Sequence, residues 1–147
     1  MSKTPIVFIE IRLFAHATED LSKVAEAVKQ IFPVGYSEEV EFRRTNLKGH
    51  YGNPITLFEA KIKDGKKARA FVDSLFSRIS LTDKEDLLRE IGLHVEKGSL
   101  YLRLDKQAAL RGEVKLCTED PIRVRIRFRK GEIEEILEVC KESGMLP

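Results

Sequence analysis

The sequence lacks several features that usually reveal what a protein does. Its 147 residues contain no tryptophan and only two cysteines, Cys117 and Cys140, which lie far apart and belong to no CxxC motif. Such isolated cysteines indicate reduced, partly buried thiols rather than a disulfide. No stretch approaches the roughly 18 uninterrupted apolar residues of a membrane span, and no basic-then-apolar signal pattern opens the chain. We therefore expect a soluble, cytoplasmic protein without membrane contact.

Motifs for the common enzymatic chemistries are also missing. The chain has no GxSxG, no GxxxxGK[ST], no HExxH and no GxGxxG after an expected strand, so acyl transfer, nucleotide hydrolysis, zinc proteolysis and dinucleotide binding lack support. The three histidines, His16, His50 and His94, are widely scattered. With Asp20 or Asp105 they could assemble a metal or acid-base site, but nothing in their spacing favours one. We expect no cofactor, no metal and no catalytic residue.

Charge is abundant but nearly balanced. Charged residues make up 34% of the chain, whereas the formal net charge is only +2. A nucleic-acid site would therefore depend on how charge is distributed and not on the net charge. The many Lys and Glu residues are typical of a heat-adapted intracellular protein. The length predicts one domain, 1–147, large enough to bury a core without metals or disulfides.

Hydrophobic periodicity predicts an α+β fold. Alternation with a period of two indicates five strands with one buried face: Pro5 to Phe14, Val40 to Thr45, Ile55 to Ile62, Ser99 to Asp105 and Pro121 to Arg129. Apolar residues three and four positions apart indicate four helices: Leu21 to Phe32, Ala68 to Ile79, Thr82 to Ile91 and Glu132 to Lys141. We expect a two-layer domain, with a largely antiparallel sheet covered by helices on one face and polar on the other.

The last expected strand carries a row of arginines. Between its apolar residues stand Arg123, Arg125, Arg127 and Arg129, which would share one strand face over roughly 20 Å at about 6.6 Å per pair of residues. Such a row could follow a phosphate backbone. Like charges this close repel unless acids or an anionic ligand compensate them.

Two interpretations of this arginine ladder differ in what they expect of its neighbours. A solvated face with internal ion pairs would use the available acids, which are Glu10, Glu41, Glu59 and Glu113. A binding track would instead be extended by further arginines, with Arg12, Arg43, Arg44 and Arg103 as the candidates.

The stretch from Asn46 to Pro54 is too elaborate for a plain hairpin turn. Two to five residues suffice to connect two strands, so Lys48, His50, Tyr51 and Asn53 are not needed for turning. They offer positive charge, a hydrogen-bonding ring, a stacking surface and an amide, which suit contacts with a polyanion or a nucleobase. Alternatively, the tyrosine covers the edge of the core and the histidine is an incidental loop residue.

A polar triplet follows the fourth expected strand. Asp105 is well placed to cap a helix by accepting from the following backbone amides. That role would leave Lys106 and Gln107 free to contact a ligand.

Three blocks of the chain resemble a known family. These are residues 16–20 (HATED), 49–55 (GHYGNPI) and 102–109 (LRLDKQAA), in this order and spacing. They are similar to the archaeal RNA-binding protein family often described as a predicted exosome subunit, over nearly the whole chain. The resemblance implies an α+β fold similar to that of a 5S-rRNA-binding ribosomal protein, and a role in RNA binding. It supplies no catalytic residues.

The sequence therefore predicts a non-catalytic RNA-binding protein, with the exosome, RNA processing or ribosome-associated proteins as its setting. The expected phosphate contacts are Lys48, Lys106, Arg103 and the ladder Arg123, Arg125, Arg127 and Arg129. Tyr51 and Tyr101 would stack on unpaired bases, and His50, Asn53 and Gln107 would hydrogen-bond to base edges or 2′-hydroxyls.

Two alternatives remain open at this point. One is a protein-binding adaptor in a larger complex. The other is an RNA-processing enzyme that uses His50 or His16 beside Asp105.

Overall fold

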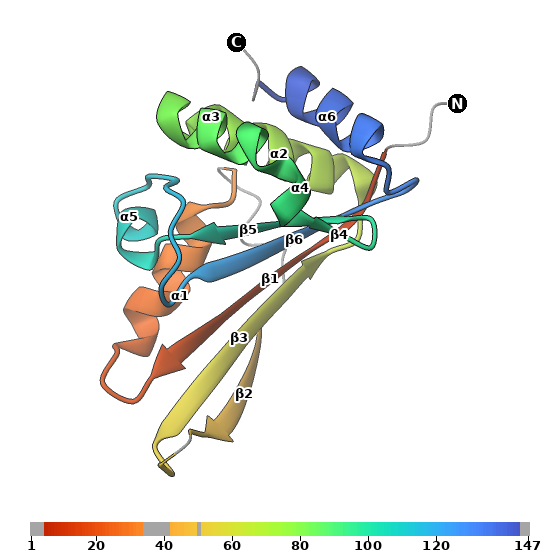
Figure 1. Ribbon diagram of the computed structural model, residues 1–147. Coiled ribbons are helices and arrows are strands. Elements are labelled where there is room, and N and C mark those ends of the chain that lie inside the picture. Colours follow the sequence, from red (N-terminus) through yellow and green to blue (C-terminus); the bar gives the residue numbers. More distant parts are fainter. Residues whose placement is uncertain (1–4, 34–41, 50, 145–147) are drawn as a thin grey trace.

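The fold is built on one antiparallel sheet. The computed structural model describes residues 5–33, 42–49 and 51–144. Within these ranges six strands pair in the order β2-β3-β1-β6-β5-β4. The strands are β1 (Ile6–His16), β2 (Phe42–Lys48), β3 (Pro54–Ile62), β4 (Val95–Glu96), β5 (Ser99–Leu104) and β6 (Ile122–Phe128). The two longest strands, β1 and β3, lie side by side, and the β2–β3 hairpin extends away from the rest of the molecule (Figure 1).

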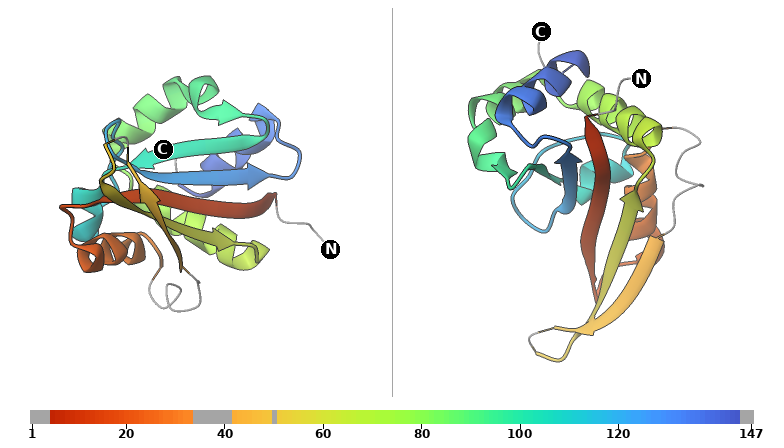
Figure 2. Two further views of the ribbon diagram at one scale, coloured as in Figure 1. Left: turned by 90° about the horizontal axis from the view of Figure 1, so that it is seen from below. Right: turned by 90° about the vertical axis from the view of Figure 1, so that its right-hand side faces the viewer.

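Helices cover one face of this sheet. They are α1 (Leu21–Gln30), α2 (Gly65–Arg78), α3 (Leu81–Arg89), α4 (Ile91–His94), α5 (Lys106–Leu110) and α6 (Ile133–Glu142). Viewed from below, the strands lie in front and the longer helices behind them (Figure 2, left). We call the helix-covered face inner and the opposite face outer. The predicted α+β class, antiparallel sheet and one-sided helical layer are confirmed.

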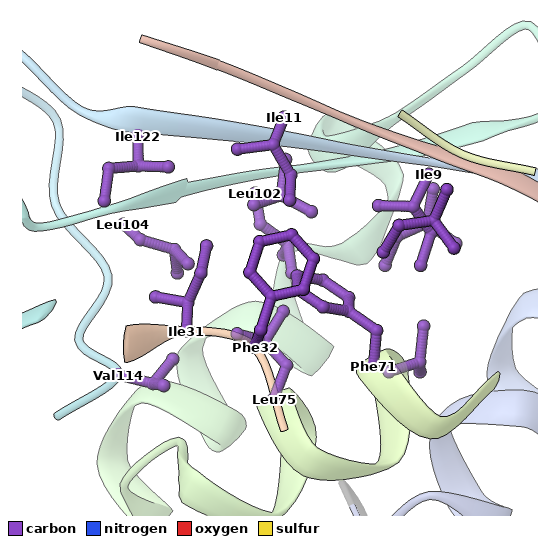
Figure 3. Packing of buried hydrophobic residues seen from close by; sticks show 14 of the residues in the cluster. Ile9, Ile11, Ile31, Phe32, Phe71, Leu75, Leu102, Leu104, Val114 and Ile122 are labelled. Carbon is purple, nitrogen blue, oxygen red and sulfur yellow. The ribbon is translucent and has the colours of Figure 1, made fainter. Parts of the chain in front are cut away.

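Alternating residues of the central strands build the core. On β1 the side chains of Ile9, Ile11 and Leu13 are fully buried on the inner face, as their spacing predicts. They meet the apolar stripes of the helices, where the Phe32 and Phe71 rings lie between sheet and helix (Figure 3). These two rings pack edge to face with their centroids 5.1 Å apart, an arrangement that adds about 1 kcal/mol beyond burial.

The β2–β3 connection is shorter than the sequence predicts. Asn46 and Leu47 pair with Thr56 and Ile55, so they belong to β2. The remaining turn is tight, because the Gly49 amide donates to the Asn53 carbonyl at 2.6 Å. The beginning of the predicted second strand, residues 40–41, lies outside the described residues.

The two cysteines are free, as predicted, and Cys140 is fully buried. Burial raises the pKa of its thiol to about 12. No helix in the described part of the chain has the length and apolar character needed to cross a membrane.

Candidate functional site

The outer face of the sheet gathers the arginines that the sequence places on separate strands. On β6 the buried residues Ile122, Val124 and Ile126 face inwards, so the alternating arginines face outwards. Strand pairing sets Arg123 directly opposite Arg12 of β1 on one side and Arg103 of β5 on the other. Residues paired in this way share a face. Three arginines from three neighbouring strands therefore lie next to one another on the outer face.

This row continues onto two further strands. Arg12 pairs with Glu59 of β3, which pairs in turn with Arg43 of β2. We call these five residues the arginine row; in order across the sheet they are Arg103, Arg123, Arg12, Glu59 and Arg43. Strands lie about 4.8 Å apart, so the first three α-carbons span only about 10 Å. Like charges directly opposite each other on a sheet are destabilising.

Acids compensate this row only in part. The Glu59 carboxylate lies 3.4 Å from Nε of Arg12, in a partly exposed ion pair. Among the described residues, no carboxylate forms an ion pair with Arg103 or Arg123. The row therefore keeps a local excess of positive charge that an anion could neutralise.

The other arginines of β6 have partners within the protein. Nε of Arg125 donates to the Ser99 hydroxyl at 3.0 Å, and its guanidinium lies 3.5 Å from Glu10. The same guanidinium lies 5.2 Å from the Phe8 ring centre and 6.0 Å from that of Tyr101. Arg125 therefore lies within cation–π distance of two aromatic rings.

Arg127 and Arg129 do not continue a free track. Arg127 donates to the Lys97 carbonyl and so fixes the turn between β4 and β5. Arg129 lies beyond the end of β6, and its backbone amide donates to the Pro5 carbonyl at 2.7 Å. Three of the four arginines of the predicted ladder lie within β6, and local contacts engage Arg125 and Arg127, so their contact with RNA stays a prediction.

The candidate extensions of the ladder separate by face. Arg12, Arg43 and Arg103 extend the basic surface across the strands. Arg44 lies instead over the ring of Phe58, a buried core residue, at 5.1 Å. Among the acids, Glu10 and Glu59 lie within the surface, Glu113 pairs elsewhere with Arg111 at 3.5 Å, and Glu41 lies outside the described residues.

Two open grooves meet on this outer face. One, of about 430 Å³, lies over β5 and β6 beside α4 at the edge of the sheet and is lined by Arg103, Arg123 and Tyr101. The other, of about 730 Å³, lies over β3 and is lined by Arg43, Lys61 and Lys67. Both grooves are also lined by Glu10 and Arg12, so they form one path across the strands.

The tip of the β2–β3 hairpin lies apart from the arginine row. Lys48 and Asn53 are exposed there, and 86% of the Tyr51 surface is accessible. His50 lies outside the described residues. Pro54, where β3 begins, is five residues from Glu59 and hence roughly 17 Å away along the strand. A single short ligand would not be expected to contact both places.

Lys106 occupies a structural position. The residue is only 6% exposed, and its ammonium donates to the Phe14 carbonyl, to Glu19 at 3.2 Å and to Asp120 at 3.0 Å. The expectation that this charge is free for a ligand is wrong, because all its strong partners lie within the protein. Its neighbour Gln107 is exposed.

The residues of the enzymatic alternative have other contacts. Asp105 caps α5 by accepting from the Ala108 amide at 3.0 Å, as predicted.

Nε2 of His16 lies 3.1 Å from Asp120 and 4.0 Å from Glu19. These three side chains could in principle hold a metal ion, but the Lys106 ammonium already bridges the two carboxylates. Burial would raise the pKa of Asp120, yet the hydrogen bonds from Lys106 and His16 hold it below its ordinary value.

Sequence reasoning missed some residues of the outer face. Phe8 and Lys61 contribute to it, with the Lys61 ammonium 4.3 Å from the Phe8 ring centre. Alternation along β1 could have indicated Phe8, since it precedes Glu10 and Arg12 at the same spacing. The opposition of Arg12, Arg103 and Arg123 depends on strand order and register, which no local pattern contains.

Comparison with known proteins identifies the family. Residues 8–128 match a family model described as RNA binding. The chain is 42% identical over 124 residues to RNA-binding protein PAB1135 of Pyrococcus abyssi, covering 82% of this chain and 80% of that protein. It is 32% identical over 145 residues to the uncharacterized protein MJ0213 of Methanocaldococcus jannaschii, covering 92% and 97%.

Solved structures agree with this assignment. Protein SSO0741 from Sulfolobus solfataricus superposes with a TM-score of 0.78 at 28% identity, covering 92% of this chain and 96% of that one. Mth689, a DUF54 protein from Methanothermobacter thermautotrophicus, gives 0.73 at 26% identity, covering 97% and 98%. The chain therefore belongs to the RNA-binding family whose model it matches, alongside these archaeal relatives.

Proposed function

We propose that this protein binds RNA on the outer face of its sheet, with the arginine row as the main phosphate contact and without chemistry of its own. The observation that carries the proposal is the juxtaposition of Arg12, Arg103 and Arg123. Three guanidinium groups held side by side repel one another, and only one has an ion-pair partner among the described residues. An anionic ligand would relieve that repulsion, and guanidinium groups bind phosphate well.

The shape of the surface supports a path across the strands. The two grooves share the walls formed by Glu10 and Arg12 and lie on either side of them. A backbone that followed this path would pass from Arg103 through Arg123 and Arg12 towards Arg43. A path along β6 would instead meet Arg125 and Arg127, whose charges are already engaged.

The hairpin tip would make a separate and weaker contribution. Lys48, Tyr51 and Asn53 are exposed there, and a longer RNA could reach them as well as the arginine row. His50 belongs to the same proposed contact through its position in the sequence. Replacing Tyr51 should alter selectivity among RNAs more than salt dependence, because stacking involves no counterion release.

Titration of RNA at several salt concentrations tests this function. The wild-type protein should bind at low salt, with an affinity that falls steeply as salt rises. Arg123→Ser should weaken binding, whereas Arg89→Ser, which removes an exposed arginine from α3, should not. Absence of binding at low salt, or equal affinity of the two variants, would refute the proposal.

The family resemblance also supports an accessory role in RNA processing beside the exosome. If that role is correct, the protein should co-purify with exosome subunits from native extract and remain bound after RNase treatment. If RNase releases all protein partners, the association depends on RNA alone. The adaptor alternative predicts protein partners without RNA at moderate salt.

A further inference from the structure

The groove beside α4 contains groups that the binding of phosphate does not require. It lies where β5, β4 and α4 meet at one edge of the sheet. Its walls include three of the row's arginines, Arg12, Arg103 and Arg123, together with Tyr101, His94, Leu93 and Glu96. An aromatic ring, an apolar side chain and a carboxylate therefore stand next to a phosphate-binding surface.

Tyr101 presents a supported stacking surface in this groove. The side chain is 39% exposed although it lies on a central part of β5. The Arg125 guanidinium lies over this ring, 6.0 Å from the ring centre, and Ser99 and Glu10 hold the guanidinium in place. The ring is thus positioned before any ligand arrives, which lowers the entropy cost of stacking.

Two further wall residues are exposed and add an apolar side chain and a carboxylate to the groove. Leu93 in the short helix α4 is 82% exposed. Glu96 is exposed on β4, directly opposite Ser99, and among the described residues no cation pairs with its carboxylate. A carboxylate near a basic surface weakens the binding of phosphate, so its position favours a ligand that also carries N–H donors.

We infer that this groove binds one unstacked base of a single-stranded RNA, with guanine preferred. The base stacks on Tyr101 beside Leu93, its Watson–Crick edge faces Glu96, and the adjoining phosphates lie on Arg103 and Arg123. Guanine is favoured because its N1–H and N2–H groups are neighbouring donors that one carboxylate can accept together. A duplex cannot place a base there, because its Watson–Crick edges are already paired.

This inference rests on the proposed function and adds a base and a strandedness to it. The groove volume of about 430 Å³ lies within the range of about 300–1,000 Å³ that is usual for small-ligand sites. Other occupants fit less well: Glu96 would repel an acidic peptide, and the arginines would repel a basic one.

Labelled uridine octamers with one central G, A, C or U test the base preference. The octamer with guanine should bind at least fivefold more tightly than the others. Glu96→Gln should reduce that preference to less than twofold, because the amide cannot accept from two donors in the same way. Glu85→Gln, an exposed glutamate on α3, is the matched control and should keep the preference.

Two further measurements test the stacking and the strandedness. Tyr101→Ala should weaken all four octamers about fivefold or more, and Tyr101→Phe, which keeps an aromatic ring, should weaken them less than Tyr101→Ala does. A duplex with the same sequence should bind at least tenfold more weakly than the octamer with guanine. Circular dichroism should show that each variant is folded.

The outcomes separate this inference from the proposed function. If the octamers bind with steep salt dependence but without base preference, or if the preference survives Glu96→Gln, the inference is wrong and phosphate binding stands. Equal binding of duplex and single strand also overturns it. If no RNA binds at low salt, both proposals fail.

Discussion

Individual cations in this protein fall into two groups according to their partners. Lys106 is buried and donates to a carbonyl and two carboxylates. Arg78 is similar, because its guanidinium donates to the Gln30 and Ile31 carbonyls at 2.8 and 2.6 Å and burial lowers its pKa. Arg103 and Arg123, in contrast, extend from exposed positions of the sheet. The amino-acid composition does not distinguish these two groups. Only the exposed cations, such as Arg103 and Arg123, can neutralise a ligand's charge.

Replacing Lys106 should therefore affect stability and not RNA affinity. Lys106→Met leaves Glu19 and Asp120 without their shared cation, and we expect a loss of about 1–3 kcal/mol because both carboxylates are partly exposed. Urea unfolding measures this loss. Lys23→Met, at an exposed position of α1, is the control and should change stability by less than about 0.5 kcal/mol. A loss of RNA affinity at unchanged stability would contradict this assignment.

Asp120 provides a prediction about pH. Its pKa is held below the ordinary value of 3.8 by the hydrogen bonds from Lys106 and His16, which outweigh the opposing effect of burial. A depressed pKa in the folded state stabilises the protein above the ordinary pKa, and this stabilisation is lost as pH falls through the folded-state value. Asp120→Asn should therefore destabilise the protein near pH 7, by about 1 kcal/mol or less at this half-exposed site.

Thermal unfolding of the wild type and Asp120→Asn between pH 7 and pH 2 checks this prediction. The difference between the two proteins should be constant at neutral pH and should shrink only below pH 3.8. A difference that is already absent at pH 6 would show that the ion pairs of Asp120 do not contribute.

At the scale of elements, five of the six strands in the described residues were predictable from sequence because their alternation is local, whereas β4 is only two residues long and shows no alternation. The central strand β1 and the arginine-bearing β6 have the predicted inward residues. The helix caps were harder to predict. Asp20 caps α1 and Ser80 caps α3, although the nearby Thr18 and Thr82 also have side-chain oxygens that can accept from the first backbone amides of a helix. Capping depends on which residue first adopts extended backbone geometry, and neighbouring polar residues compete for that position.

The two turns at one edge of the sheet interlock through glycine. Gly98 follows Lys97 in the β4–β5 turn, and both have positive φ, 80° and 49°. Gly131 follows β6 with φ 77°, and a β-carbon on it would lie 2.7 Å from the Gly98 α-carbon. The backbone therefore needs glycine here for two reasons, its conformation and the close approach of the two turns.

Alanine substitutions can separate these two reasons. Gly131→Ala should destabilise the protein by more than Gly52→Ala, because Gly52 has nearly the same φ of 79° but open space around it. We expect about 1 kcal/mol for Gly52→Ala from strain alone and at least about 1 kcal/mol more for Gly131→Ala from overpacking. Chemical denaturation gives both values, and equal losses would show that the turns can separate at little cost.

At the scale of the whole molecule, the candidate site is a product of topology. Arg12, Arg103 and Arg123 are far apart in the sequence and meet because β1, β6 and β5 are neighbours in the sheet. The sequence predicts the strand face that carries arginines, but the row runs across the strands instead of along one of them. Long-range pairing decides this direction, and local periodicity contains no information about it.

The salt dependence of RNA affinity in Arg103→Ser and Arg127→Ser tests this account most directly. Arg103 belongs to the arginine row, which runs across the strands, and Arg127 belongs to the arginine ladder, which runs along β6. The account predicts that Arg103→Ser weakens binding and reduces the slope of log affinity against log salt by roughly 0.7 units for a single strand, while Arg127→Ser leaves the slope unchanged. A reduced slope in Arg127→Ser together with an unchanged slope in Arg103→Ser would place the RNA along β6 and contradict it.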